Sequence, residues 1–206
     1  MTTRAELRTV IRNQGIDDST WSDNEVNQWI ADAIAEYSIH FPRWRESADN
    51  ACVAEQHEYD LPADFLHALS VEYPAGEDPA VFLERASESP GGLDSDHFDI
   101  QGTKLILGPS PSAGETYTLQ YQAHHDYPDA DDDTLTIPDE DLEILILFVV
   151  WKAYRRLELD EAINPDGSTV ILSMLGTNAG RAKRNFEAAL KRRSLPSSGH
   201  VSWGEE

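Results

Sequence analysis

Cysteine is the scarcest residue in this 206-residue chain, which contains Cys52 alone. A single thiol cannot form a disulfide within the chain, and it excludes metal sites built from several thiolates. We expect Cys52 to be a small, half-buried hydrophobic residue. Long apolar runs are also missing. None follows the opening residues MTTRAELRTV, and the longest falls short of the roughly 18 to 20 residues that span a bilayer. We therefore expect a soluble, non-secreted protein.

Motifs for catalysis and cofactor binding are missing as well. The segment PGGLD lacks the lysine and the helix of a phosphate-binding loop. No Ser, Cys or Lys has a recognisable base partner. Among the seven histidines, His124 and His125 are neighbours on a predicted strand and point to opposite faces, so they cannot share a metal ion. We expect no catalytic residue, no metal and no cofactor, and the chain is not predicted to be an enzyme.

Positive charge is scarce, and lysine most of all. The chain has 38 acidic residues against 16 basic ones, of which only four are lysine, for a net charge of −22. From Glu46 to Asp141 there are 23 acidic residues against Arg85 and Lys104. A lysine-poor acidic surface is typical of proteins in concentrated salt, where about 1 M salt screens repulsion to about 3 Å. An acidic protein of an ordinary cytoplasm is the alternative.

The N-terminal flank has the signals of two helices. The residues TRAE, Thr3 to Glu6, fit a capping box, and Gly15 stops the helix. Ser22 and Glu25 form a second box, with Trp21 and Val26 at the positions of a hydrophobic staple. The apolar stripe of the first helix consists of Leu7, Val10 and Ile11. The second helix, which runs up to Pro42, has apolar residues at helical spacing on one face.

The C-terminal flank predicts two further helices. Pro138 suits a first turn, and the three acidic residues after it lie at the positive end of the helix dipole, so we expect a helix to about residue 160. A last helix is expected over about residues 166–193. Gly176 and Gly180 weaken it by about 1 kcal/mol each relative to alanine, which indicates close packing or a bend. Its predicted apolar positions are Ile171, Leu172, Leu175, Ala182, Phe186, Ala189 and Leu190.

The middle of the chain has the two-residue period of strands. YTLQYQA alternates apolar and polar residues, HFDIQGTKLILG predicts two strands around a turn at Gly102, and Leu69, Val71 and Tyr73 form a shorter run. The fold class is therefore α+β, an antiparallel helical bundle with an inserted small antiparallel β-sheet domain. The predicted domains are the N-terminal helices 1–45, the acidic β-rich insertion 46–137, the C-terminal helices 138–194 and an extended tail 195–206.

The acidic segment DADDDTLTIPDE, residues 129–140, has two interpretations. A calcium-binding loop of the helix–loop–helix type carries its ligands at positions 1, 3, 5 and 12. Against that interpretation, Thr134 replaces the required glycine, Pro138 stiffens the end of the loop, and a strand precedes it. The alternative is an acidic loop that caps the following helix. The residues at the calcium-ligand positions are Asp129, Asp131, Asp133 and Glu140.

The segment LEILILFVVW, residues 142–151, is apolar on every side of a helix. Such a helix needs cover on every side, and a bundle of four short helices would leave part of it exposed. A second copy of the chain would supply the missing cover. The alternative is a monomer in which the β-sheet folds over this helix. The predicted subunit-interface residues are Leu142, Ile144, Leu145, Leu147, Phe148 and Trp151.

The last helix carries six basic residues against Glu187 alone. They could bind nucleic acid, although stacking aromatics are missing. They could also form a solvated face that complements the helix dipole, or dock against acidic protein surface such as the middle domain of a neighbouring copy. The tail beyond the helix ends in an alternating segment with Val201 and Trp203, which is suited to insertion into a partner. The six basic residues are Arg181, Lys183, Arg184, Lys191, Arg192 and Arg193.

The order of these motifs resembles the head-to-tail adaptor (connector) proteins of tailed viruses. The likeness covers about residues 20 to 160, from WSDNEVNQWIADAIAEY through YDLPADFLHALSVE and FDIQGTKLILGPSPSAGETYTLQYQA to IPDEDLEILILFVVWKAYR. It implies a structural virion protein of the neck, present in the host cytoplasm during assembly. Such adaptors combine a helical bundle with, in many cases, a β-rich insertion, and none is an enzyme.

The resemblance also implies the partners. Adaptors form a ring, usually of twelve copies, between the portal protein and a downstream neck or tail protein. Packaged DNA passes through the lumen without sequence-specific binding. Their C-terminal segments commonly grip the portal, which assigns portal binding here to Arg192, Arg193, Val201 and Trp203. With the salt-adapted composition, the resemblance implies a virus of a haloarchaeon. The runner-up is an acidic monomeric or dimeric binding module, with calcium in the 129–140 loop.

Overall fold

The computed structural model describes residues 1–86, 93–164 and 166–194, and the chain divides into two compact units. Unit 1 combines Met1–His40 with the chain from Asp126 onward, and unit 2 is Phe41–His125. The described residues form four α-helices and seven strands, which confirms the mixed α+β class. The single antiparallel helical bundle and the domain boundaries at 45/46 and 137/138 stay predictions.

The first two helices of unit 1 begin where their capping residues predict. Helix α1 spans Arg4–Arg12 and helix α2 spans Asp23–His40. The amide of Glu6 donates to Thr3 Oγ1 at 3.2 Å, and the amide of Thr3 donates to the Glu6 carboxylate at 2.8 Å. Ser22 and Glu25 form the same reciprocal pair at 3.3 and 3.0 Å. Both boxes therefore satisfy amide groups that have no partner within the helix.

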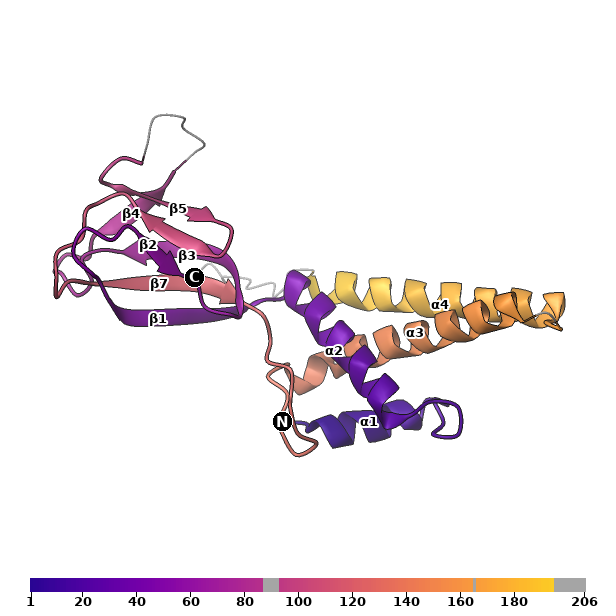
Figure 1. The fold of residues 1–206 in the computed structure, drawn as a ribbon. Coiled ribbons are helices and arrows are strands. Elements are labelled where there is room, and N and C mark those ends of the chain that lie inside the picture. Colours follow the sequence, from indigo (N-terminus) through magenta and orange to yellow (C-terminus); the bar gives the residue numbers. More distant parts are fainter. Residues whose placement is uncertain (87–92, 165, 195–206) are drawn as a thin grey trace, which may run out of the picture. The chain divides into compact units, whose positions relative to one another are not determined.

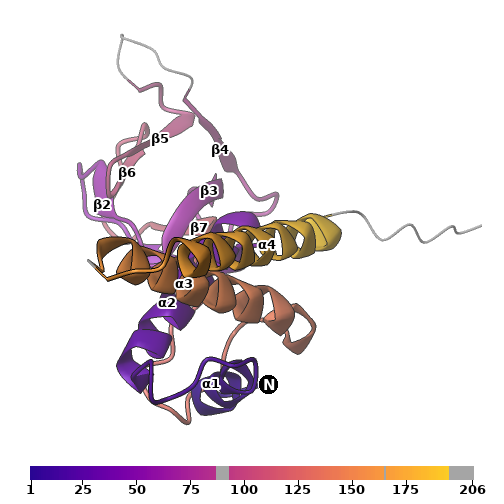
Figure 2. The ribbon, with the colours of Figure 1, turned by 90° about the vertical axis from the view of Figure 1, so that its right-hand side faces the viewer.

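The second pair of helices forms a hairpin. A short 3₁₀ turn at Asp139–Asp141 leads into α3, Leu142–Ile163, and α4, Thr169–Ser194, returns alongside it, as Figures 1 and 2 show. Helix α3 is the centre of unit 1, because α1, α2 and α4 all contact it. No described helix combines the length and the apolar character that crossing a membrane requires.

Two predicted apolar faces of unit 1 are only partly buried. In α1, Leu7 and Ile11 are buried, but Val10 is exposed. In α4, Ile171, close to the start of the helix, is exposed. The prediction that Val10 and Ile171 belong to buried stripes was therefore wrong. The buried residues of α4 are mostly small: Ala179, Ala182, Phe186 and Ala189.

The connection between unit 2 and α3 packs on α1. Leu135 and Ile137 are almost completely buried. The amide of Arg4 donates to the carbonyl of Asp133 at 3.2 Å, and the amide of Leu135 donates to the carbonyl of Thr2 at 2.9 Å. The segment 126–137 thus belongs by its contacts to unit 1, although its polar, acidic sequence is similar to that of the β-rich region.

Unit 2 is a sheet of seven strands in the order β1-β7-β3-β4-β5-β6-β2. Figure 1 shows that this sheet is curled. All neighbouring pairs are antiparallel except β4 and β5, which are parallel, so the predicted purely antiparallel sheet is corrected to a mixed one. The strands are β1 Arg43–Ala51, β2 Glu58–Asp60, β3 Phe65–Glu72, β4 Phe82–Arg85, β5 His97–Gln101, β6 Lys104–Leu107 and β7 Thr116–Ala123.

The curl of the sheet encloses the core of unit 2. Tyr59 lies on β2, at one edge, and its ring centroid is 5.1 Å from that of Tyr117 on β7, near the other edge. Such a contact requires the sheet to fold back on itself. Cys52, predicted to be half-buried, lies in this core and is buried. The core also includes Val71, Tyr73, Leu83, Phe98, Leu105, Leu107, Leu119, Tyr121 and Ala123.

The predicted inward residues of β7, such as Leu119 and Ala123, are buried, but its alternation is incomplete because the polar Thr118 is buried as well. On β3 the alternation breaks down. There, Ala68 pairs with Tyr121 and Ser70 pairs with Gln120, which leaves Leu69 as the extra residue of a bulge. Leu69 is therefore exposed, contrary to the prediction, while Val71 is buried.

Candidate functional site

The apolar segment of α3 is largely covered within unit 1. Ile144, Leu145 and Phe148 are buried, and Leu145 is completely buried. Leu142, Leu147 and Trp151 keep part of their surface accessible. The six predicted interface residues therefore form a buried group and a partly accessible group. Only Leu142, Leu147 and Trp151, the accessible group, have surface that could contact another copy. Their role in a subunit interface stays a prediction.

Three aromatic rings hold the hairpin together. Phe148 and Trp151 of α3 and Phe186 of α4 have ring centroids 5.3 to 6.2 Å apart. Their edge-to-face and stacked arrangements are those that aromatic pairs prefer. Lys183 Nζ lies 5.7 Å from the centroid of the Trp151 ring, so a cation covers part of the indole. Trp151 is thus a packing residue of the hairpin, and this role does not depend on what its accessible edge touches.

A buried carboxylate joins the start of α3 to the end of α4. Asp141 Oδ2 accepts a hydrogen bond from the Tyr37 hydroxyl at 2.6 Å and one from Arg193 Nε at 2.9 Å. The Asp141 side chain is 4% exposed and lies at the positive end of the α3 dipole. Burial, and then the hydrogen bond to the Asp141 carboxylate, raises the pKa of Tyr37, which keeps the phenol protonated and donating.

The two arginines predicted to bind the portal are engaged within unit 1. Arg193 pairs with Asp141, and its Nη2 lies 3.7 Å from a carboxylate oxygen of Glu140. Arg192 lies 3.4 Å from Glu143 in a more exposed pair. These pairs anchor the last turn of α4 beside the start of α3. Val201 and Trp203 lie outside the described residues, and portal binding by all four stays a prediction.

The acidic loop contacts α1 and does not have the geometry of a calcium site. Asp131 bonds both Arg4 and Arg8, with Arg8 Nη2 2.7 Å from Asp131 Oδ2. These two guanidinium groups lower the pKa of Asp131 to about 2. Asp133 accepts a hydrogen bond from the Ala130 amide, and Asp139 accepts from Thr2. Two of the four predicted calcium ligands, Asp131 and Asp133, therefore already have donors within the chain.

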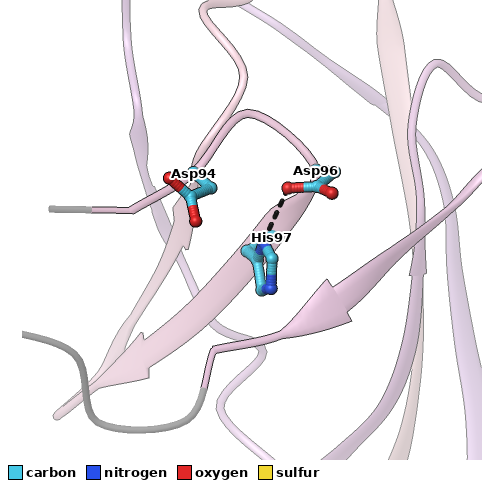
Figure 3. A group of neighbouring side chains, drawn as sticks. All are labelled: Asp94, Asp96 and His97. Atoms are coloured by element: carbon cyan, nitrogen blue, oxygen red, sulfur yellow. Dashed lines mark hydrogen bonds and ion pairs between the residues drawn. The ribbon is translucent and has the colours of Figure 1, made fainter.

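One group in the described part of the chain brings three possible cation ligands together. Asp94, Asp96 and His97 have one ligand atom each, all within 4.8 Å of one another, beside the start of β5 (Figure 3). His97 Nδ1 is 2.7 Å from Asp96 Oδ1, so two of the three groups already satisfy each other. Both aspartates are exposed. Exposed acidic groups commonly lie together without a bound ion, so we assign no metal-binding role to this cluster.

Comparisons with known proteins identify the family. The family model described as SU10 adaptor protein matches residues 2–202, which is nearly the whole chain. The chain therefore belongs to the SU10 adaptor protein family, a family of phage adaptors. A comparison with curated proteins gave no match. Family membership supports the resemblance to the head-to-tail adaptors of tailed viruses, a structural class that is typically non-enzymatic. It also suggests a place at the head–tail junction of the virion.

The contacts that organise unit 1 were not predicted from the sequence. Tyr37 and Asp141 are 104 residues apart, and Arg8 and Asp131 are 123 residues apart. No short motif marks such pairs. One signal was present: Asp141 directly precedes a helix that is apolar on all sides, and a carboxylate held against such a helix needs donors nearby.

Proposed function

We propose that this protein is a ring-forming head-to-tail adaptor that joins the portal to the tail of a tailed virus. Family membership over residues 2–202 is the observation that carries the proposal. In the ring, copies contact one another through Leu142, Leu147 and Trp151 of α3, and a portal protein and a downstream neck or tail protein bind at the two ends. The four helices form one antiparallel bundle in the assembled particle.

The charge of the chain suits passage of DNA through a lumen. With a net charge of −22, the protein repels phosphates rather than binding them, so packaged DNA slides past without sequence-specific contacts. We infer from the shortage of lysine that the virus infects a haloarchaeon and that the ring assembles in concentrated salt. Salt at about 1 M screens the repulsion between like-charged copies to within about 3 Å.

The stoichiometry of the assembled complex tests the proposal. The full chain is purified in high salt, alone and with the cognate portal protein, and its mass is measured by light scattering and by native mass spectrometry. A closed oligomer of defined copy number, usually twelve in such adaptors, is the expected result. A protein that stays monomeric or dimeric with its portal present would contradict the ring. Stabilisation by calcium that chelator abolishes would favour the acidic binding module instead.

A further inference from the structure

Three cations on the outer face of α4 lack, within the described part of the chain, the carboxylate partner that most Lys and Arg side chains of the molecule have. At least eleven of the sixteen Lys and Arg side chains form ion pairs with carboxylates of the same chain. Arg181, Arg184 and Lys191 have no carboxylate partner among the described residues. In a chain with such an excess of acid, three unpaired cations on one helix call for an explanation.

These cations share one stripe along α4. Residues 170, 174, 177, 181, 184, 188 and 191 follow each other at alternating spacings of four and three, so they lie in one row along the helix, and all are exposed. The row extends over roughly 32 Å at 1.5 Å per residue. It lies opposite the buried row of α4, which begins at Ala179 and packs on α3. In Figures 1 and 2, α3 is the helix alongside α4.

The other end of this row is apolar. Val170 is 76% exposed and Met174 is 56% exposed. Ile163, at the end of α3, is 79% exposed, and Leu159 and Ile171 are exposed nearby in the hairpin. Single exposed apolar residues are ordinary, but five lie at one end of the hairpin, and two of them, Val170 and Met174, share one face of α4. The outer face of α4 therefore combines apolar contact area with unpaired positive charge.

Simpler explanations account for only part of this face. The helix dipole acts within the last turn, which includes Lys191 but not Arg181 or Arg184. Binding of nucleic acid would use the cations but would leave Val170 and Met174 facing phosphates, which offer them no favourable contact. A protein surface that is acidic and partly apolar matches both ends of the row.

We propose that the outer face of α4 docks on unit 2 of a second copy of this chain. Unit 2 offers the complementary charge. Six of its carboxylates, named at the end of this paragraph, are exposed and have no ion pair or side-chain hydrogen bond in the described residues. This contact rests on the proposed ring, because a face on one copy meets a different face on the next in a head-to-tail interface. The carboxylates are Asp49, Glu55, Glu77, Asp78, Glu84 and Asp94.

Charge reversal on the row is the first test. Arg181→Glu with Arg184→Glu should weaken assembly of the full chain with its portal by roughly tenfold or more, because two attractive contacts become repulsive. Val170→Ser with Met174→Ser should weaken it through the apolar end. The matched control is Arg155→Glu with Arg156→Glu, which makes the same charge change on α3, at cations that are paired within the chain. Circular dichroism checks that each variant remains helical.

Cross-linking between copies is the second test. Copies with and without ¹⁵N label are mixed before assembly and treated with a carbodiimide, which couples an amine directly to a carboxylate. Lys191, together with the amine introduced by Arg184→Lys, should couple to a carboxylate of unit 2, and the linked peptides should pair labelled with unlabelled chain. Linked peptides that come from single copies alone would overturn the proposal.

The outcomes separate this inference from the proposed function. If the wild-type chain forms a ring and Arg181→Glu with Arg184→Glu forms the same ring equally well, the α4 contact is wrong and the adaptor assignment stands. If the wild-type chain forms no multi-copy complex with its portal, both fail. If the charge-reversed variant assembles normally but loses retention of double-stranded DNA, the face binds nucleic acid and the proposal is overturned.

Discussion

Arg193, in the last turn of α4, donates a hydrogen bond to the buried Asp141 at the start of α3, over 2.9 Å. The pair closes the α3–α4 hairpin at its open end, and the Tyr37 hydroxyl joins it from α2. Three helices thus meet at one carboxylate.

Removal of the Asp141 carboxylate should destabilise unit 1. Asp141→Ala should lower the free energy of unfolding by about 2 to 3 kcal/mol, because the Tyr37 hydroxyl is left buried without its acceptor and Arg193 loses its partner. Urea denaturation followed by circular dichroism measures the change. Arg192→Ala, which breaks the exposed pair with Glu143, is the control and should cost less than about 1 kcal/mol. Equal effects of the two substitutions would contradict a special role for Asp141.

The Asp131 cluster predicts a specific sensitivity to acid. Arg8 and Arg4 lower the pKa of Asp131 to about 2, against about 3.9 in an unfolded chain. A carboxylate whose pKa is lower in the folded state stabilises that state above its unfolded pKa, and the contribution disappears as pH falls from about 4 towards 2.

The comparison of wild type with Asp131→Asn tests this sensitivity. The wild-type chain should be the more stable at pH 6, and the difference should shrink towards pH 2. Melting temperatures measured across this range at constant salt give the result. A difference that is independent of pH would mean that Asp131 acts through packing rather than charge.

The two glycines of α4 should respond differently to alanine. At Gly180 the nearest atom to an added Cβ is Arg184 Nη1 at 3.6 Å, so Gly180→Ala should stabilise the protein by about 0.5 to 1 kcal/mol through helix propensity. At Gly176 the Cβ would lie 3.0 Å from Glu158 Oε1, so part of that gain should be lost as the carboxylate moves. Thermal unfolding of both variants checks the order, and a larger gain from Gly176→Ala would refute it.

Substitutions on α3 separate core residues from interface residues. Leu145→Ala should destabilise the isolated chain by about 3 kcal/mol, because it leaves a cavity in a fully buried site. Leu147→Ser, at a partly accessible site, should leave the isolated chain folded and reduce assembly with the portal. Urea denaturation reports the first effect and native mass spectrometry the second. If Leu147→Ser assembles normally, Leu147 is not an interface residue.

Much of the local structure could be predicted from neighbouring residues. The capping boxes at Thr3 and Ser22 and the turn at Gly102 depend on residues within a few positions of each other, and the structure contains all three. The buried face of β7 follows likewise from the alternation of its side chains. Strand β1 escaped prediction because its sequence, RWRESADNA, is polar on both faces. It is an edge strand, held by hydrogen bonds to β7, and edge strands need little apolar surface.

What the sequence determined by itself was therefore local: helix starts, turns, the apolar face of β7, the acidic charge and the mixed α+β class. The tertiary structure decided which distant groups meet, such as Tyr37 with Asp141 and Arg8 with Asp131. It also decided that α3, apolar on every side, is mostly covered within its own unit, and that the cations of α4 face outward. The physical reason is that backbone geometry and side-chain period act over a few residues, whereas burial and ion pairing depend on how separate elements pack.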